Sequence, residues 1–218
     1  MKAVVSATLA VLALSATSVF AADIVGDAAA GKSKNAMCIG CHSIPGYQAS
    51  FPEVHKVPMI AGQNAAYIGA ALHAYKKGDR KHPTMRGIAD TLNDQDIADL
   101  AAYYAAEAGQ PAGVPETPAA PDAKTAELLT KGGCVACHGV NFNKPVDGSY
   151  PKIAGQHADF LYVALKAYKT EKNPQVGRNN AIMAATAKNF SNDELKTLAK
   201  YIGSLPGDLK TVPQSRFR

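Results

Sequence analysis

Apolar residues recur along this 218-residue chain at intervals of three and four positions, as they do on one face of an amphipathic helix. Ile97, Leu100 and Tyr104 form one such series, and no segment shows the convincing alternation of a strand. The pattern predicts three principal helices in each half of the chain. Their expected ranges are about 27–42, 64–76 and 94–106 in the first half and 122–138, 158–169 and 192–203 in the second.

The third helix of each half has the clearest start signal. Ser191 precedes Glu194 by three residues, which is the spacing of a capping box, and Asn93 precedes Asp96 in a close acidic version. These pairs predict helices that begin directly after Asn93 and Ser191.

The two halves are copies of one another. Residues 58–63 (Pro-Met-Ile-Ala-Gly-Gln) return as residues 151–156 (Pro-Lys-Ile-Ala-Gly-Gln), and residues 74–76 (Ala-Tyr-Lys) return as 167–169. Duplication of one domain is the simplest explanation. Between the copies lies a segment with four prolines, which disfavour helix and predict an extended, fairly stiff linker.

The N-terminus has the features of a cleaved signal peptide. Lys2 gives a basic start, an uncharged run follows, and Ala21 and Ala22 fit a small-residue cleavage site. A retained membrane anchor is the alternative, against which the serines and threonines of the run argue. We expect a signal peptide at 1–21, domains at 22–108 and 122–218, and the proline-rich linker at 109–121.

All four cysteines lie in two Cys-x-x-Cys-His motifs, at residues 38–42 and 134–138. Cysteines three residues apart on a helix place both thiols within reach of the two vinyl groups of one haem, and the next histidine can ligate the iron. A thioredoxin-like pair, a zinc site or two disulfides would not require these histidines. The motifs predict two covalently bound haem c groups. They would be attached through Cys38, Cys41, Cys134 and Cys137, with His42 and His138 as axial ligands.

Two methionines occupy matching positions in the repeat and are candidates for the sixth iron ligand. Met85 and Met183 each precede the expected cap of the third helix by eight residues, whereas Met59 is matched by Lys152. A thioether opposite histidine favours ferrous iron and closes the coordination site, which suits electron transfer. The rival ligands are four histidines: His55, His73, His82 and His157. Of these, His73 is matched by Lys166 and His157 by Asn64, whereas the other two have no partner in the repeat. His82 lies nearest to a candidate methionine.

Charge is unevenly distributed between the halves. Residues 22–121 contain eight basic and ten acidic side chains, a net charge of −2, whereas residues 122–218 contain fourteen and eight, a net charge of +6. Such a dipole can orient the molecule toward a charged partner; a purely solubilising role is the alternative. Nucleic acid is not expected as a partner, because no basic cluster is interleaved with aromatic residues.

With its two haem motifs, two Pro-x-Ile-Ala-Gly-Gln runs and two late methionines, the chain resembles c4-type dihaem cytochromes c. The resemblance implies an all-α fold of two tandem class I cytochrome c domains, with the haem propionates near their interface. It also implies that the carbonyl groups of Pro58 and Pro151 accept hydrogen bonds from the ligand histidines. Insertions before Pro58 and before Met183 depart from the repeat and border different haem edges in this interpretation, with Arg178 either pairing with a propionate or facing solvent.

The function that the resemblance implies is periplasmic electron transfer without substrate turnover. Electrons would come from a quinol-oxidising complex or a dehydrogenase of the cytoplasmic membrane and pass to a terminal oxidase or reductase, with peripheral membrane association possible. The alternatives are a dihaem peroxidase-like enzyme with one open iron and a haem subunit attached to a dehydrogenase.

Overall fold

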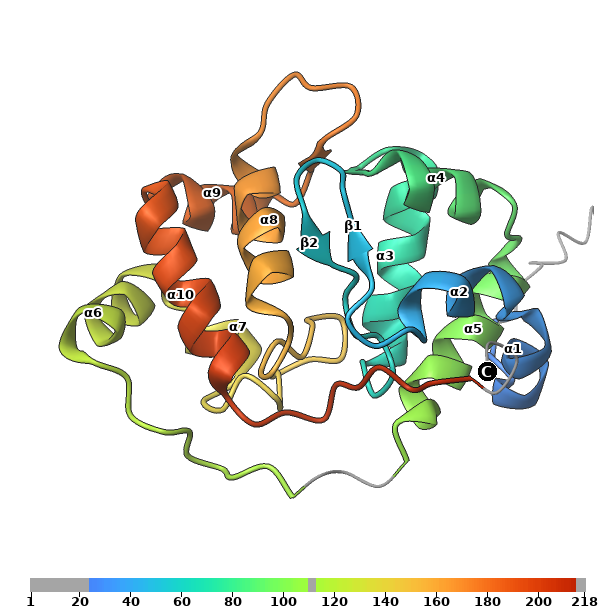
Figure 1. The fold of residues 1–218 in the computed structure, drawn as a ribbon, viewed down its shortest axis with the longest axis horizontal. Coiled ribbons are helices and arrows are strands. Elements are labelled where there is room, and N and C mark those ends of the chain that lie inside the picture. Colours follow the sequence, from blue (N-terminus) through green and yellow to red (C-terminus); the bar gives the residue numbers. More distant parts are fainter. Residues whose placement is uncertain (1–23, 110–112, 215–218) are drawn as a thin grey trace, which may run out of the picture.

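The computed structural model describes residues 24–109 and 113–214, so the expected signal peptide at 1–21 lies outside the described residues. Two groups of helices stand side by side (Figure 1). The first half of the chain contains α1 (Ala28–Lys34), α2 (Ala36–His42), α3 (Ala65–Lys77), α4 (Pro83–Asp90) and α5 (Asp94–Glu107). The second half contains α6 (Ala123–Gly132), α7 (Val135–His138), α8 (Ala158–Lys169), α9 (Ala181–Lys188) and α10 (Asn192–Ser204).

The predicted principal helices are confirmed, with two refinements. The first helix of each half is divided, into α1 and α2 and into α6 and α7. Two short helices, α4 and α9, were not predicted. Each has eight residues and begins after a side-chain cap, His82 or Asn180.

Both predicted capping boxes are present. The Asn93 side chain accepts from the Asp96 backbone N–H at 2.8 Å, and the Ser191 hydroxyl accepts from that of Glu194 at 3.1 Å. The acidic side chains bind back to the N-cap N–H groups, so α5 and α10 begin where the sequence predicted.

The core of each half forms where its last helix packs against the others. In the first half α5 contacts α1 and α3, and Ile68 and Leu100 are buried. The approach of α1 to α5 requires glycine, because a Cβ atom at Gly31 would lie 2.1 Å from the Asp99 carbonyl oxygen. In the second half α10 packs on α8 and α6, burying Leu195 and Leu198.

Among the residues that the structure describes, the connections contain four two-residue strands that the sequence pattern did not reveal: β1 (Gln48–Ala49), β2 (His55–Lys56), β3 (Arg80–Lys81) and β4 (Gly177–Arg178). Strand β1 pairs with β2, and β3 of the first half pairs antiparallel with β4 of the second. Both insertions into the repeat therefore reach the opposite half. The β1–β2 hairpin meets α8, where the Lys56 N–H donates to Asp159 at 3.1 Å, and the loop before β4 accepts from Lys81 at Asn173 O at 2.8 Å.

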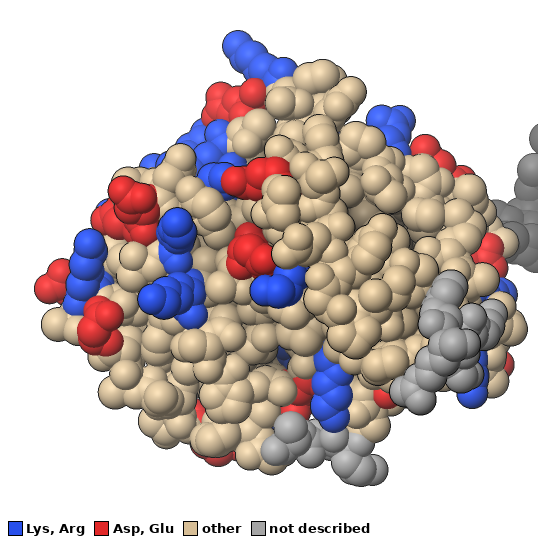
Figure 2. Space-filling model, in the orientation of Figure 1, with Lys and Arg blue, Asp and Glu red and all other residues tan. Residues whose placement is uncertain are grey.

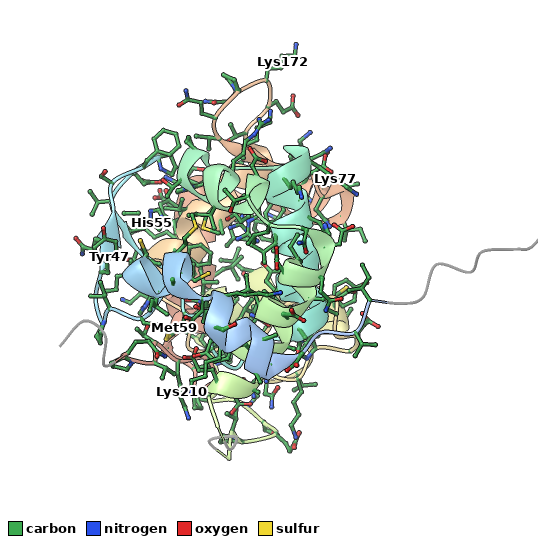
Figure 3. The ribbon with its side chains drawn as sticks, turned by 90° about the vertical axis from the view of Figure 1, so that its right-hand side faces the viewer. Tyr47, His55, Met59, Lys77, Lys172 and Lys210 are labelled. Atoms are coloured by element: carbon green, nitrogen blue, oxygen red, sulfur yellow. The ribbon has the colours of Figure 1, made fainter. Side chains whose placement is uncertain are left out.

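The chain crosses between the halves again at its C-terminal end. The Lys210 N–H donates to the Ala61 carbonyl at 3.0 Å, and its ammonium group donates to the Ala108 carbonyl at 3.0 Å. Lys210 lies below Met59 on the same side of the molecule (Figure 3). The described part of the linker, residues 113–121, has no helix or strand and contacts the second half, where the Tyr201 hydroxyl donates to Ala119 O at 2.8 Å.

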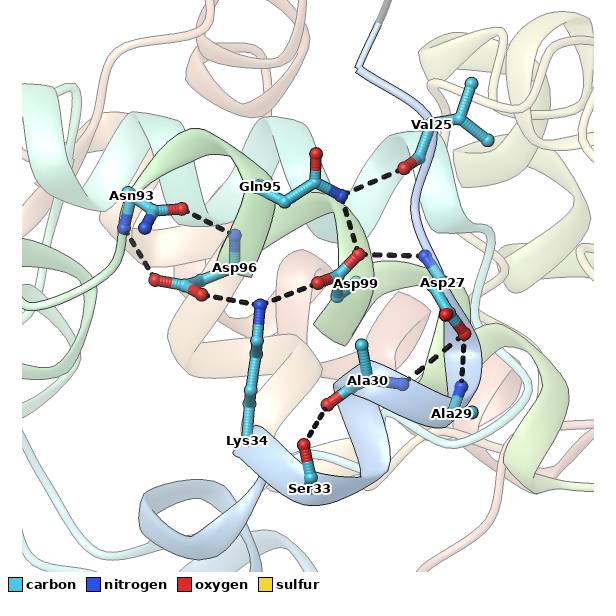
Figure 4. A network of polar contacts seen from close by, with 10 residues as sticks. All are labelled: Val25, Asp27, Ala29, Ala30, Ser33, Lys34, Asn93, Gln95, Asp96 and Asp99. Carbon is cyan, nitrogen blue, oxygen red and sulfur yellow. Dashed lines mark hydrogen bonds and ion pairs between the residues drawn. The ribbon is translucent and has the colours of Figure 1, made fainter.

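A polar network joins α1 to α5 around Asp99, a side chain only 3% exposed (Figure 4). Its carboxylate accepts from the Asp27 backbone N–H at 2.8 Å and from the Lys34 ammonium at 2.7 Å. A third donor, the Gln95 amide, lies at 2.8 Å. These donors, the backbone N–H first, lower the pKa of Asp99 from 3.8 to about 2.

We expect Asp99→Asn to destabilise the protein at pH 7 and to lose most of this effect in acid. The carboxylate contributes stability above its unfolded-state pKa, and the contribution disappears as pH falls through the folded value of about 2. Urea titration at pH 7 and between pH 4 and 2 measures the free-energy difference. Asp90→Asn, which removes an exposed pair with Arg86, is the control and should change little at either pH. If Asp99→Asn destabilises the protein equally at every pH, the stabilisation does not come from the ionised Asp99 carboxylate.

Candidate functional site

The two Cys-x-x-Cys-His motifs lie at the ends of short helices. Cys38, Cys41 and His42 lie on α2, whereas Cys134 is the N-cap of α7 and His138 is its last residue. All four thiols are free and partly buried. Burial raises the pKa of Cys38 to about 11 and also raises that of Cys134. Within residues 24–109 and 113–214 no cluster of three or more His, Cys, Asp or Glu side chains is suited to a metal ion, so the motifs do not converge on one zinc site.

Both motif histidines have one ring nitrogen bound to a proline carbonyl. The Nδ1 atom of His42 lies 2.8 Å from Pro58 O, and that of His138 lies 3.1 Å from Pro151 O. A carbonyl only accepts, so Nδ1 carries the proton and Nε2 keeps a lone pair available to a metal. Burial lowers the pKa of both histidines, which favours this neutral form.

The two candidate methionines occupy equivalent places in α4 and α9. Each is partly buried in the first turn of its helix, three residues after the N-cap. The Met85 N–H donates to His82 Nδ1 at 3.4 Å, and the Met183 N–H donates to Asn180 Oδ1 at 3.0 Å. The expectation that His82 has no partner in the repeat is wrong, because Asn180 is its counterpart and both residues cap a helix. This role explains His82 without iron ligation.

A pair of arginines at the junction of the halves was not recognised as a pair from the sequence. Arg80 on β3 lies opposite Arg178 on β4. The Arg80 guanidinium donates to the Tyr67 hydroxyl at 3.2 Å and lies 4.6 Å from the centroid of the Tyr75 ring. Arg178 lies 5.4 Å from the Tyr168 ring, the counterpart of Tyr75. The sequence does contain one indication that they are equivalent: each arginine precedes its candidate methionine by five residues.

The two arginines lack acidic partners for their positive charges in the part of the chain that the structure describes. Like charges opposite one another in a strand pair are destabilising, and neither arginine forms an ion pair with a carboxylate among the described residues. The Arg80 Nε atom is buried without a hydrogen-bond partner. Burial would raise the pKa of the Tyr67 hydroxyl, but the charges of Arg80 and Arg178 outweigh burial and lower it. The cluster therefore suits an anion that residues 24–109 and 113–214 do not supply.

The free thiols, the histidines held through Nδ1 and the unmatched arginines together fit a covalently attached, iron-containing ring with carboxylate arms. Haem c has these features: vinyl groups that take two thiols, an iron that takes imidazole nitrogen, and two propionates. No helix in the described part of the chain is long and apolar enough to cross a membrane.

Comparison with known proteins gives a consistent result. The family model described as cytochrome c matches residues 28–105 and again 123–206. A cytochrome c4 of Azotobacter vinelandii is 31% identical over 201 residues, covering 84% of this chain and 91% of the relative. A thiosulfate dehydrogenase electron acceptor of Stutzerimonas stutzeri strain A1501 is 30% identical over 177 residues, covering 77% of this chain and 78% of the relative.

A solved structure has a similar fold. Reduced recombinant cytochrome c4 from Pseudomonas stutzeri aligns with a TM-score of 0.62 and 28% identity, over 84% of this chain and 100% of the other.

Proposed function

The chain belongs to the cytochrome c family, as a c4-type electron-transfer protein with two covalently bound haem c groups, and from that premise we propose that it is a periplasmic carrier between membrane-bound redox enzymes. The two segments that match the family model fall within the limits 22–108 and 122–218, which we assign to the haem domains. When bound, each haem iron supplies one-electron chemistry by alternating between the ferrous and ferric states.

We assign the residues that hold the haems from their matching positions in the two halves. The sulfur atoms of Cys38 and Cys41, and of Cys134 and Cys137, form the thioether bonds. The Nε2 atoms of His42 and His138 would bind the irons, because each Nδ1–H is bound to a proline carbonyl and only Nε2 keeps a free lone pair. The thioethers of Met85 on α4 and Met183 on α9 would supply the sixth ligands.

The choice of a carrier over an enzyme rests on one observation: every element of the proposed ligand set occurs in both halves. The cysteine pair, the histidine with its proline acceptor, and the capped methionine all have counterparts. A peroxidase-like enzyme needs one iron with an open position. Methionine ligands in both halves would close both irons.

Arg80 and Arg178 are the proposed anchors for the propionates. Guanidinium groups bind carboxylates in a planar, bidentate manner. Anions between the two arginines relieve their repulsion and give Arg80 Nε an acceptor. Because β3 and β4 belong to different halves, one pair of carboxylate arms would be held by both.

The proposed location and partners rest on the N-terminal signal pattern, the charge distribution and one relative. On the face shown in Figure 2, charged side chains gather over the second half, whereas the surface near α2 and β1 is largely uncharged. This asymmetry supports separate docking faces for donor and acceptor. The relative named as a thiosulfate dehydrogenase electron acceptor supports a dehydrogenase as one class of donor.

The carrier function is tested with ligands of open haem iron. Two closed irons should bind cyanide or carbon monoxide slowly, while a quinol-oxidising complex reduces the protein by two electrons. Stopped-flow absorbance and a reductive titration measure both. Rapid binding of carbon monoxide at one iron would support the peroxidase-like alternative. Elution only with a dehydrogenase during purification would support the attached-subunit alternative.

We expect Met85→Ala and Met183→Ala each to abolish one of two methionine–iron signals, because each removes one thioether ligand. Optical and magnetic spectra of the oxidised protein report these signals. His82→Asn is the matched control, since it introduces the cap found at Asn180 and should leave both signals in place. If either methionine variant keeps both signals, the ligand assignment is wrong.

Arg80→Gln should lower the reduction potential of at least one haem, because a buried positive charge near a haem disfavours ferric iron. Redox titration of the purified protein measures the change. Lys172→Asn removes the same charge from the exposed loop tip in Figure 3 and should leave both potentials unchanged. Equal effects of the two variants would contradict a propionate contact at Arg80.

A further inference from the structure

The repeated loops at residues 58–63 and 151–156, here called the proline–glutamine loops, bind each other reciprocally across the two halves. Gln156 accepts the Met59 N–H at 3.0 Å and donates to Met59 O at 2.8 Å. Gln63 accepts the Lys152 N–H at 2.9 Å and donates to Lys152 O at 2.9 Å. Each glutamine amide thus pairs with the backbone of the same position in the opposite loop.

The loops hold both glutamines rigidly. Gln63 and Gln156 are 5% and 4% exposed, and each side-chain oxygen also accepts the N–H of the following residue at 3.0 Å. Gly62, just before Gln63, has φ +84°, and a Cβ atom there would lie 2.7 Å from Asp208 O. Only glycine adopts this conformation without strain. The Ala-Gly-Gln sequence therefore directs the amide at the opposite loop.

Each glutamine binds a peptide unit of the other half, and that same peptide unit binds the motif histidine of its own half. Pro58 C=O, which accepts from His42, and Met59 N–H, which donates to Gln156, belong to one peptide unit. The same holds in the second half for the peptide between Pro151 and Lys152, which lies between His138 and Gln63.

Hydrogen bonds in such a chain polarise one another. When a glutamine oxygen accepts the peptide N–H, the peptide carbonyl becomes a better acceptor and draws more strongly on the histidine Nδ1–H. The histidine then becomes a more basic ligand, and a more basic ligand stabilises ferric iron. The effect crosses the interface, because the glutamine comes from the other half.

We propose that Gln63 and Gln156 are positioning residues that tune the reduction potential of the haem in the opposite domain, Gln156 acting through His42 and Gln63 through His138. This inference rests on the proposed histidine ligation. Each domain thereby lowers the reduction potential of the haem in the other domain. The potential of each iron therefore depends on contact between the domains.

The test is a pair of variants with crossed expectations. In Gln156→Leu the potential of the first-domain haem should rise while that of the second-domain haem stays near its original value, and in Gln63→Leu the reverse should occur. Redox titrations followed by NMR, with the haem resonances assigned to each domain, give both potentials. In the ferrous protein the Nδ1 proton of His42 should move upfield in Gln156→Leu, as its hydrogen bond weakens, while that of His138 should not move.

The control variant is Asn64→Ala, which removes a different bond between the halves, from the Asn64 amide to Tyr150 O at 3.0 Å. It should leave both potentials unchanged. Gln156→Asn keeps the amide but is too short to reach Met59, so it should reproduce the Gln156→Leu shift with a smaller change in the core.

Two outcomes would overturn the inference: equal shifts of both potentials, which would indicate general loosening of the interface, or no shift in any glutamine variant. If the proposed histidine ligation is wrong, the optical and magnetic spectra of the unsubstituted protein will already lack the histidine–methionine signals. The two failures can therefore be distinguished.

Discussion

The bond from each motif histidine to a proline carbonyl is the contact on which the rest of the arrangement depends. It sets the tautomer of the ring and leaves Nε2 of His42 and His138 available to iron. It also places one peptide group of each proline–glutamine loop against the ring, and the opposite face of that peptide is bound by the other half. A change at the interface would therefore also change the hydrogen bond that orients the histidine ring.

The interface is built from both repeated and unrepeated sequence, in different ways. The two glutamines make equivalent bonds, as expected for two copies of one loop. The insertions add contacts that have no counterpart: the β1–β2 hairpin meets α8, and the loop before β4 meets β3. They join the halves, and their interpretation as borders of different haem edges stays a prediction. Departures from the repeat thus hold the copies in a fixed relative position.

Much of the local structure could be predicted from the sequence, because helix spacing and capping boxes are local signals. The starts of α5 and α10 directly after Asn93 and Ser191 are examples. Helices α4 and α9 were missed because eight residues are too few for a clear apolar period. The arginine pair and the crossed glutamines were missed for another reason. They depend on how two copies face each other, and neither periodicity nor motif spacing within one copy contains that information. The ligand roles of Met85 and Met183 remain predictions.

The C-terminal segment limits how far the two halves can be treated as independent proteins. Lys210 follows α10 of the second half in sequence, yet it donates hydrogen bonds to the Ala61 and Ala108 carbonyl groups of the first half. A first half cut off before the linker would lack both donors. Although the halves are copies of one domain, the boundary between them in sequence therefore differs from the boundary between their contacts, because a segment of the second half binds the backbone of the first.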